Sequence, residues 1–161
     1  MDMIGFREFT SNDVSSMTAI MKAAFDEDSL LFRKVPDGPP GYDDGSFLRK
    51  YALDPKSDSF CITFNGKDIG VVIVWTNMEL SENFLGCIFI DPSLREMGLG
   101  KRIWDEVEKM YPDIKVWRTE TPLYSLRNLN FYINKCGFMA YAITDPKSYE
   151  EAQVQFVKYM K

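Results

Sequence analysis

A short segment of this chain combines two glycines, an arginine and a turn that follows an apolar run. It reads Ile88-Phe-Ile-Asp-Pro-Ser-Leu-Arg95-Glu-Met-Gly98-Leu-Gly100-Lys-Arg-Ile103. A glycine-rich turn that begins a helix presents several unpaired backbone N–H groups in one direction, and the helix dipole adds partial positive charge there. Gly98 and Gly100 have no Cβ, so the backbone can approach a ligand closely, and Arg95 adds a charged donor. This chemistry suits a phosphate or pyrophosphate.

A glycine pair of this kind is equally compatible with a plain strand-to-helix turn that binds nothing. The spacing does not match Gly-x-x-x-x-Gly-Lys-Ser/Thr, and no Gly-x-Gly-x-x-Gly follows a predicted strand. The rest of the sequence must therefore decide between a ligand site and a turn.

The 161-residue chain contains no histidine. This excludes histidine-based triads and general bases, and it leaves few ways to build a zinc site, so we expect no metal. Catalysis would have to use carboxylates, tyrosine, cysteine, lysine, backbone groups and water. Cys87 and Cys136 could be proposed as nucleophiles, but nothing nearby in the sequence would lower their pKa. We therefore interpret both as core residues.

Composition limits the class of protein. The length predicts one domain over residues 1–161, and 45% hydrophobic with 27% charged residues is typical of a globular protein. A net charge of −5 argues against a nucleic-acid partner. No apolar run approaches the roughly 20 residues that span a bilayer, and no signal peptide is expected. Three widely spaced cysteines favour reduced thiols and a cytoplasmic location.

Hydrophobic periodicity predicts elements along the first half of the chain. We expect a strand at 5–9, a helix from Ser11 or Asn12 to about Phe25, a loop rich in acids over 26–45, and a helix at 46–51. Strands at 59–64 and 69–75 are joined by Asn65-Gly66, a strong hairpin signal.

The second half begins with a buried strand at 84–90. A helix follows Gly98 and buries Leu99, Ile103, Val107 and Met110. After a strand at 114–117, a helix that follows Thr121-Pro122 buries a stripe of Leu126, Leu129, Ile133 and Cys136, and Gly137 ends it. Strands at 138–143 and 152–160 complete an α/β sheet.

This element order, with Arg95–Gly100 after the fourth strand, resembles the GNAT superfamily of acetyl-CoA-dependent N-acetyltransferases. Ile90-Asp91-Pro92 stands where members of that family have a hydrophobic residue, Asp and Pro before the Arg/Gln-x-x-Gly-x-Gly/Ala loop. Phe131-Tyr132-Ile-Asn-Lys-Cys-Gly137-Phe138 looks like the family's Phe-Tyr-x-Lys-x-Gly-Phe segment. The resemblance covers about residues 84–138. It implies a single GNAT-like domain with a mixed, mostly antiparallel sheet of about six or seven strands, splayed central strands and about four flanking helices.

The resemblance also implies acetyl-CoA as cosubstrate. Its pyrophosphate would lie on backbone N–H groups of the glycine loop, and its pantetheine arm would pair with the strand that ends at Ile90. The residues implied to bind it are Ile88, Phe89, Ile90, Arg95, Glu96, Met97, Gly98, Leu99, Gly100 and Lys101, together with Ser125 and Asn130 farther along the chain.

By the same resemblance, Tyr132 would be the general acid that protonates the departing thiolate. Family members commonly have this tyrosine four residues before the glycine, whereas Tyr132 precedes Gly137 by five. Alignment on Gly137 would place Ile133 in the tyrosine's position. We prefer alignment on Phe131-Tyr132, with one extra residue at the helix end, and we expect Tyr132 to lie at the edge of the buried stripe.

A carboxylate must take a proton from the attacking amine, which is protonated in solution. Glu82 is our predicted base, and the other candidates are Asp28, Asp43, Asp44, Glu79 and Glu120. The acidic loop at 26–45 would favour a cationic acceptor such as a polyamine or an aminoglycoside.

Our leading hypothesis is an enzyme that transfers an acetyl group directly from acetyl-CoA to a primary amine of a small molecule or peptide. The alternatives are a CoA-binding sensor or partner-binding module that has lost catalysis, and a plain α/β domain without a coenzyme site. An exposed final strand would offer an edge for a homodimer.

Overall fold

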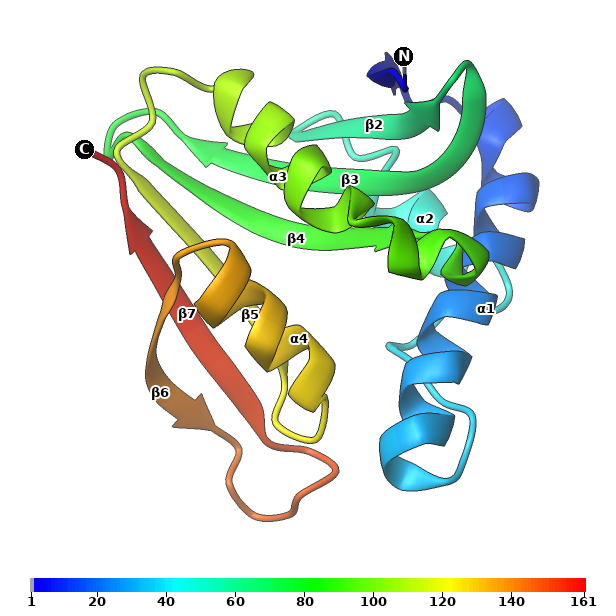
Figure 1. Cartoon of the computed structure of the whole chain (residues 1–161), viewed down its shortest axis with the longest axis vertical. Coiled ribbons are helices and arrows are strands. Elements are labelled where there is room, and N and C mark those ends of the chain that lie inside the picture. The colour runs from blue at the N-terminus through cyan, green and yellow to red at the C-terminus, as the bar shows by residue number, and fades with distance from the viewer. Residues whose placement is uncertain (1) are drawn as a thin grey trace.

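The computed structural model describes residues 2–161, which form one seven-stranded sheet with helices on both faces (Figure 1). The strand order is β1-β2-β3-β4-β5-β7-β6, and every neighbouring pair is antiparallel except β4 and β5. The strands are β1 (Ile4–Glu8), β2 (Ser57–Phe64), β3 (Lys67–Asn77), β4 (Glu82–Ile90), β5 (Val116–Pro122), β6 (Met139–Thr144) and β7 (Gln153–Tyr159). The predicted mixed, mostly antiparallel sheet is confirmed.

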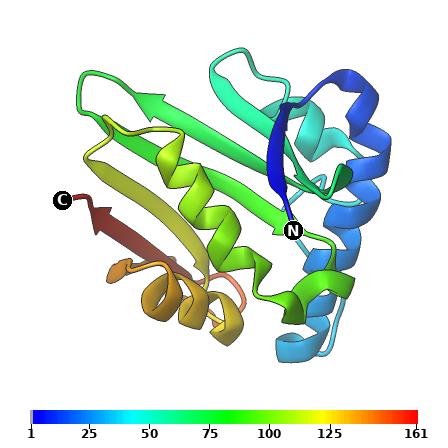
Figure 2. The same cartoon turned by 45° about the horizontal axis from the view of Figure 1, so that its top comes forward.

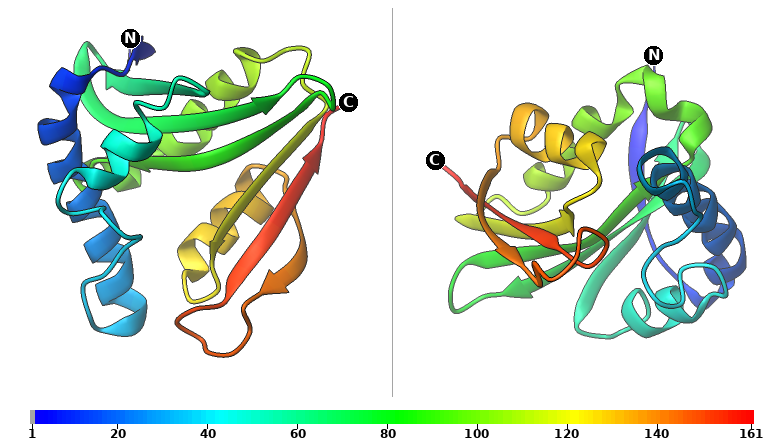
Figure 3. Two further views of the ribbon diagram at one scale, coloured as in Figure 1. Left: turned by 180° about the vertical axis from the view of Figure 1, so that it is seen from behind. Right: turned by 90° about the horizontal axis from the view of Figure 1, so that it is seen from below.

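The helices are α1 (Val14–Arg33), α2 (Ser46–Tyr51), α3 (Leu99–Lys109) and α4 (Leu126–Asn130), with short turns η1 (Ser11–Asp13), η2 (Pro92–Met97) and η3 (Phe131–Lys135). Helices α3 and α4 cover one face of the sheet, and α1 and α2 cover the other (Figures 2 and 3). Each face has its own core. Trp104 and Trp117 are fully buried in the core under α3 and α4, and Met21 and Leu48 are fully buried in the core under α1 and α2.

The two central strands diverge soon after they meet. β4 pairs with β5 only through Glu82–Phe84 and Val116–Arg118, and β5 then runs away from β4 (Figure 1). The Thr119 hydroxyl donates a hydrogen bond to the Leu85 carbonyl oxygen at 2.9 Å, where the backbone ladder has already ended. Beyond that point the β5-facing backbone edge of β4 has no strand partner among residues 2–161, so the predicted splay of the central strands is present.

A β-bulge lies at the start of this divergence. In the pairing of β3 with β4, Ile73 is opposite Cys87 and Val74 is opposite Leu85, so Gly86 is the extra residue. The bulge reverses the faces of β4: Leu85 packs in the α3 core, whereas Cys87 packs in the α1 core. A Cβ on Gly86 would lie 2.7 Å from Nε1 of Trp75, so glycine is required by this contact.

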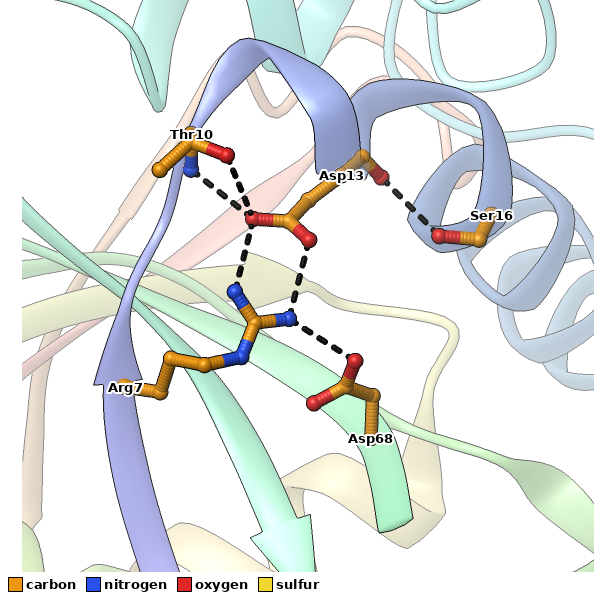
Figure 4. A network of polar contacts seen from close by, with 5 residues as sticks. All are labelled: Arg7, Thr10, Asp13, Ser16 and Asp68. Carbon is orange, nitrogen blue, oxygen red and sulfur yellow. Dashed lines mark hydrogen bonds and ion pairs between the residues drawn. The ribbon is translucent and has the colours of Figure 1, made fainter.

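The first strand is held to the first helix by a polar network around Asp13 (Figure 4). Arg7 donates two hydrogen bonds to the Asp13 carboxylate, at 2.9 and 3.1 Å, and one to Asp68 at 2.7 Å. Asp13 also accepts from the backbone N–H of Thr10 at 2.8 Å and forms a capping box with it. These contacts lower the pKa of Asp13 to about 2, chiefly through the Arg7 guanidinium.

Two sequence-based expectations need correction. Helix α1 does not end near Phe25 but continues to Arg33, and Lys34 (φ 67°) ends it. The added turns carry exposed Leu30 and Leu31 and are joined to other elements by ion pairs, so they give no apolar periodicity. The final strand is not the free edge either, because β7 lies between β5 and β6. Within residues 2–161, no helix is long and apolar enough to cross a membrane.

Candidate active site

The glycine turn connects the end of β4 to α3 through η2. The Asp91 carboxylate accepts from the Ser93 backbone N–H at 2.9 Å and begins this turn. Gly98 has φ 70° and directly precedes α3, whose first turn has no side-chain cap. A Cβ at Gly98 would meet nothing within 4 Å, so the backbone angle favours glycine there. At Gly100 a close contact favours glycine, because a Cβ there would lie 3.0 Å from Cε1 of Phe131.

The residues predicted to bind coenzyme fall into two groups. Glu96, Met97 and Gly98 are exposed in the turn, and Lys101 is exposed in α3, where its ammonium pairs with Asp105. Phe89 and Leu99 are buried, while Ile88, Ile90 and Gly100 are partly buried. A ligand on this loop would therefore meet the backbone of Leu99 and Phe89 rather than their side chains.

Arg95 lies at the centre of a charged cluster that the sequence analysis missed. Its Nε is 3.0 Å from Oε1 of Glu27 in α1, and Nη1 of Arg127 in α4 donates to the same oxygen at 3.1 Å. Burial lowers the pKa of Arg95, and the Arg127 charge acts in the same direction. Glu27, Arg95 and Arg127 come from segments far apart in sequence, so no local pattern could have indicated the cluster.

Ser125 and Asn130 do not play equivalent parts. Ser125 is fully buried, and its hydroxyl donates to the Asp28 carboxylate at 3.1 Å while it caps the start of α4. Burial raises the pKa of Asp28, against the opposing effect of that hydrogen bond. Asn130 is exposed, and its side-chain oxygen accepts from Asn134 at 2.7 Å. Ser125 thus contacts α1.

Tyr132 is buried rather than at the edge of the helix stripe. It is 6% exposed, and its ring packs against Phe138 and Phe156. The predicted stripe is wrong in two positions, because Leu126 is 60% and Ile133 41% exposed. Burial raises the pKa of Tyr132, so the phenol stays protonated at neutral pH.

Two neighbouring side chains also affect the pKa of Tyr132, though less than burial does: Cys87 of β4 raises it, and Thr119 of β5 lowers it. Tyr132 also shares its core with Leu85 of β4 and Trp117 of β5, the two strands that separate.

A π-helical turn accounts for the spacing between Tyr132 and Gly137. In η3, the backbone N–H of Cys136 bonds to the Phe131 carbonyl oxygen, five residues back, at 3.0 Å. A π-turn holds one residue more than an α-helical turn. The extra residue that the alignment on Phe131-Tyr132 requires is therefore accommodated inside the helix.

Two of the candidate bases lie on the diverging strands. Glu82 of β4 accepts from Nε of Arg118 at 2.5 Å, which gives it a charged partner. Glu120 of β5 is exposed and accepts from the amide nitrogen of Gln155 at 2.7 Å, a neutral partner. The acids predicted to form an acidic loop are mostly partnered; Asp26, for example, is bonded to Lys22 and Tyr42.

The cysteines are confirmed as core residues. Burial raises the pKa of both Cys87 and Cys136 to about 12, so neither thiol is an activated nucleophile. Over residues 2–161, no three metal-ligating side chains of the Cys, Asp or Glu type gather in one place.

The fold and the glycine turn together define a class of protein. The profile of the acetyltransferase (GNAT) family matches residues 18–138, which is most of the chain. The protein belongs to this family.

Among known proteins, YrkN of Bacillus subtilis (strain 168), which is described as uncharacterized, is 37% identical over 107 residues. The match covers 66% of this chain and 57% of YrkN, so the chain spans little more than half the length of that relative.

Solved structures share the fold at low sequence identity. An acetyltransferase from Thermus thermophilus matches with a TM-score of 0.78 at 13% identity, over 98% of this chain and 97% of its own. The PaiA N-acetyltransferase from Thermoplasma acidophilum, solved in complex with coenzyme A, matches with a TM-score of 0.76 at 13% identity, over 98% of this chain and 99% of its own. The ribosomal-protein-S18-alanine N-acetyltransferase from Escherichia coli matches with a TM-score of 0.70 at 17% identity, over 100% of this chain and 95% of its own.

Proposed function

We propose that this protein transfers an acetyl group from acetyl-CoA to a primary amine without a covalent enzyme intermediate. The observation that supports the proposal is the closeness of two features, the glycine turn and the buried phenol of Tyr132: Gly100 in the first turn of α3 lies against Phe131, the residue before Tyr132. One offers backbone donors for an anion and the other a protonated group for a leaving thiolate.

Backbone N–H groups at the start of α3 would hold the coenzyme pyrophosphate, and Arg95 would contribute charge. The PaiA structure, which contains coenzyme A and shares this fold, supports coenzyme A as the ligand class. The unpaired edge of β4 would hold the pantetheine amides and present a donor to the thioester carbonyl. Such a preorganised donor typically contributes about 3 kcal/mol to transition-state stabilisation.

Tyr132 would donate its proton to the coenzyme thiolate as the amine attacks the thioester carbon. The new C–N bond forms as the C–S bond breaks, and a carboxylate takes the proton that the amine loses. Of the two candidate carboxylates on β4 and β5, the contacts favour Glu120 over the predicted Glu82. A proton accepted by Glu82 would disrupt its ion pair with Arg118, whereas the partner of Glu120 is neutral.

A second candidate function is a coenzyme-binding module without catalysis. The Arg95–Glu27 contact favours it, because this ion pair links the glycine turn to α1 and could respond to a bound phosphate. The three free, buried cysteines support the cytoplasm as the compartment in either case.

The test is a calorimetric titration with acetyl-CoA of wild type, Gly98→Val and the matched variant Gly66→Val. Both glycines have positive φ and open surroundings, but Gly66 lies in the β2–β3 hairpin. We expect micromolar binding that only Gly98→Val loses. Binding without acetyl transfer to any of a broad amine panel would support the second candidate. No binding to wild type would overturn both.

A further inference from the structure

A small hollow lies on the sheet face opposite α3, next to the point where β4 and β5 begin to diverge. Three side chains form a row across adjacent strands: Trp75 of β3 is paired with Phe84 of β4, which is paired with Arg118 of β5. Residues directly opposite in a sheet point to the same face. With Thr76, Asn77 and Glu82 they line a hollow of about 190 Å³.

The hollow adjoins the expected reaction centre. The Trp75 indole lies over Gly86, since a Cβ there would be 2.7 Å from its Nε1, and Gly86 is the bulge residue where β4 leaves β5. Phe84 and Gly86 are two positions apart, or about 7 Å along a strand. A group seated between Trp75 and Phe84 would therefore be separated from the thioester by a short linker.

A third aromatic ring lies against Arg118, one of the residues that line the hollow. Tyr141 interrupts the pairing of β6 with β7 as the residue between Ala140 and Ala142, which is a bulge. The Arg118 guanidinium lies 5.5 Å from the centre of the Tyr141 ring. A bulge commonly redirects a side chain, and here the tyrosine of the edge strand contacts the guanidinium of Arg118.

The charges in the hollow cancel. Nε of Arg118 bonds to the Glu82 carboxylate, so the hollow has no excess of negative charge to attract a polycation. Its volume is also below the roughly 300 Å³ at which pockets for drug-sized ligands begin. These features disfavour an aminoglycoside and suit a single planar apolar group.

We propose that this hollow is the acceptor subsite, and that it selects amines that carry an aromatic ring on a short alkyl chain. The ring would stack between Trp75 and Phe84, and the amine would reach the thioester beside Gly86. The inference rests on the proposed acetyl transfer for its purpose, but the ring-binding site can be tested without it.

The first measurement is a nuclear magnetic resonance titration of the nitrogen-15-labelled protein, which observes the three tryptophan indole N–H signals. Trp75→Phe assigns the Trp75 signal, and buried Trp104 and Trp117 serve as internal controls. The probes are 2-phenylethylamine and 2-cyclohexylethylamine, which match in size but differ in aromaticity. We expect the Trp75 signal to shift with about three- to tenfold tighter binding of the aromatic amine. Equal affinities, or no shift of Trp75, would overturn the proposal.

The second measurement is acetyl transfer to the same two amines by wild type, Phe84→Leu and the control Phe64→Leu at the end of β2. We expect a preference for the aromatic amine in kcat/KM that only Phe84→Leu loses, with unchanged affinity for acetyl-CoA. Transfer to both amines without preference would refute the subsite and leave the proposed function standing. Failure of acetyl-CoA to bind would refute the proposed function, and the Trp75 titration would still decide the subsite.

Discussion

The backbone N–H of Cys136 donates to the carbonyl oxygen of Phe131, five residues earlier, at 3.0 Å. A regular α-helix would join residues four apart, so this turn contains one additional residue. Tyr132 lies inside the turn and faces the core, and Gly137 with φ 82° follows its end. The unusual spacing between Tyr132 and Gly137 thus has a structural cause, the extra residue that the π-turn holds.

Deletion of Asn134 should convert this π-turn into an α-helical turn. Asn134 is exposed, and its removal would place Cys136 four residues after Phe131. We expect the free energy of unfolding to change by no more than about 1 kcal/mol, since a surface residue is lost and the helix hydrogen bond is retained. Denaturant unfolding measures this. A loss of several kcal/mol would mean that core packing depends on the π-turn.

Substitution of Tyr132 by phenylalanine should remove the proposed proton donor while keeping the ring contacts with Phe138 and Phe156. We expect kcat to fall about 100-fold, a typical contribution of general acid catalysis, with little change in the affinity for acetyl-CoA. Steady-state kinetics and calorimetry separate the two quantities. Tyr111→Phe is the control, because that hydroxyl bonds to Asp58 away from the splay. Unchanged kcat in Tyr132→Phe would exclude Tyr132 as the acid.

The two candidate bases can be distinguished by neutralising each. We expect Glu120→Gln to lower kcat/KM about 100-fold near neutral pH and Glu82→Gln to have a smaller effect. The loss in Glu120→Gln should diminish as the pH approaches the pKa of the amine, because the acceptor then arrives deprotonated. The pH profile of kcat/KM checks this. The opposite order of effects would restore Glu82 as the base.

Glu27 holds both Arg95 and Arg127, and it should therefore compete with a coenzyme phosphate for their charges. We expect Glu27→Gln to bind acetyl-CoA about two- to fivefold more tightly at low salt, a range set by the small free energies of exposed ion pairs. Added salt should reduce the gain. Glu79→Gln makes the same charge change at an exposed position outside the cluster. Weaker binding by Glu27→Gln would indicate that the ion pair shapes the site instead.

Asp13 should make stability depend on pH in the acid range. Its pKa is about 2 in the folded protein against an ordinary 3.8, so its contribution is complete above about pH 4 and is lost as the pH falls toward 2. We expect Asp13→Asn to lower the free energy of unfolding by about 1 to 2 kcal/mol at pH 7, allowing for the partial exposure of Arg7. Urea unfolding at several pH values should show the difference shrinking below pH 4. If the difference in the free energy of unfolding between wild type and Asp13→Asn did not change with pH, the substitution would act through packing and not through the lost charge.

Much of the fold could be predicted because its elements have strong local signals. The Asn65-Gly66 turn, with φ values of 51° and 83°, joins β2 to β3 as expected. The glycine turn before α3 is likewise a local feature, since the angle at Gly98 depends on residues adjacent in sequence.

The rest depends on contacts between distant segments. The last turns of α1 are joined by Glu27 to Arg127, 100 residues away, and no periodic pattern encodes such a pair. The position of β7 inside the sheet is a property of topology, which short-range patterns do not specify. A π-turn changes the angle between successive side chains, so the stripe expected for a regular helix misplaced Ile133.

The single extra residue at Gly86 also has a consequence for how this protein could change during evolution. Because side chains alternate along a strand, its loss would turn one half of β4 over relative to the other. Phe84 would then exchange faces with Leu85. The hollow beside Trp75 would lose the Phe84 ring from its lining, and the α3 core would receive Phe84 in place of Leu85. We therefore expect a deletion at this site to be tolerated less well than one in a surface loop.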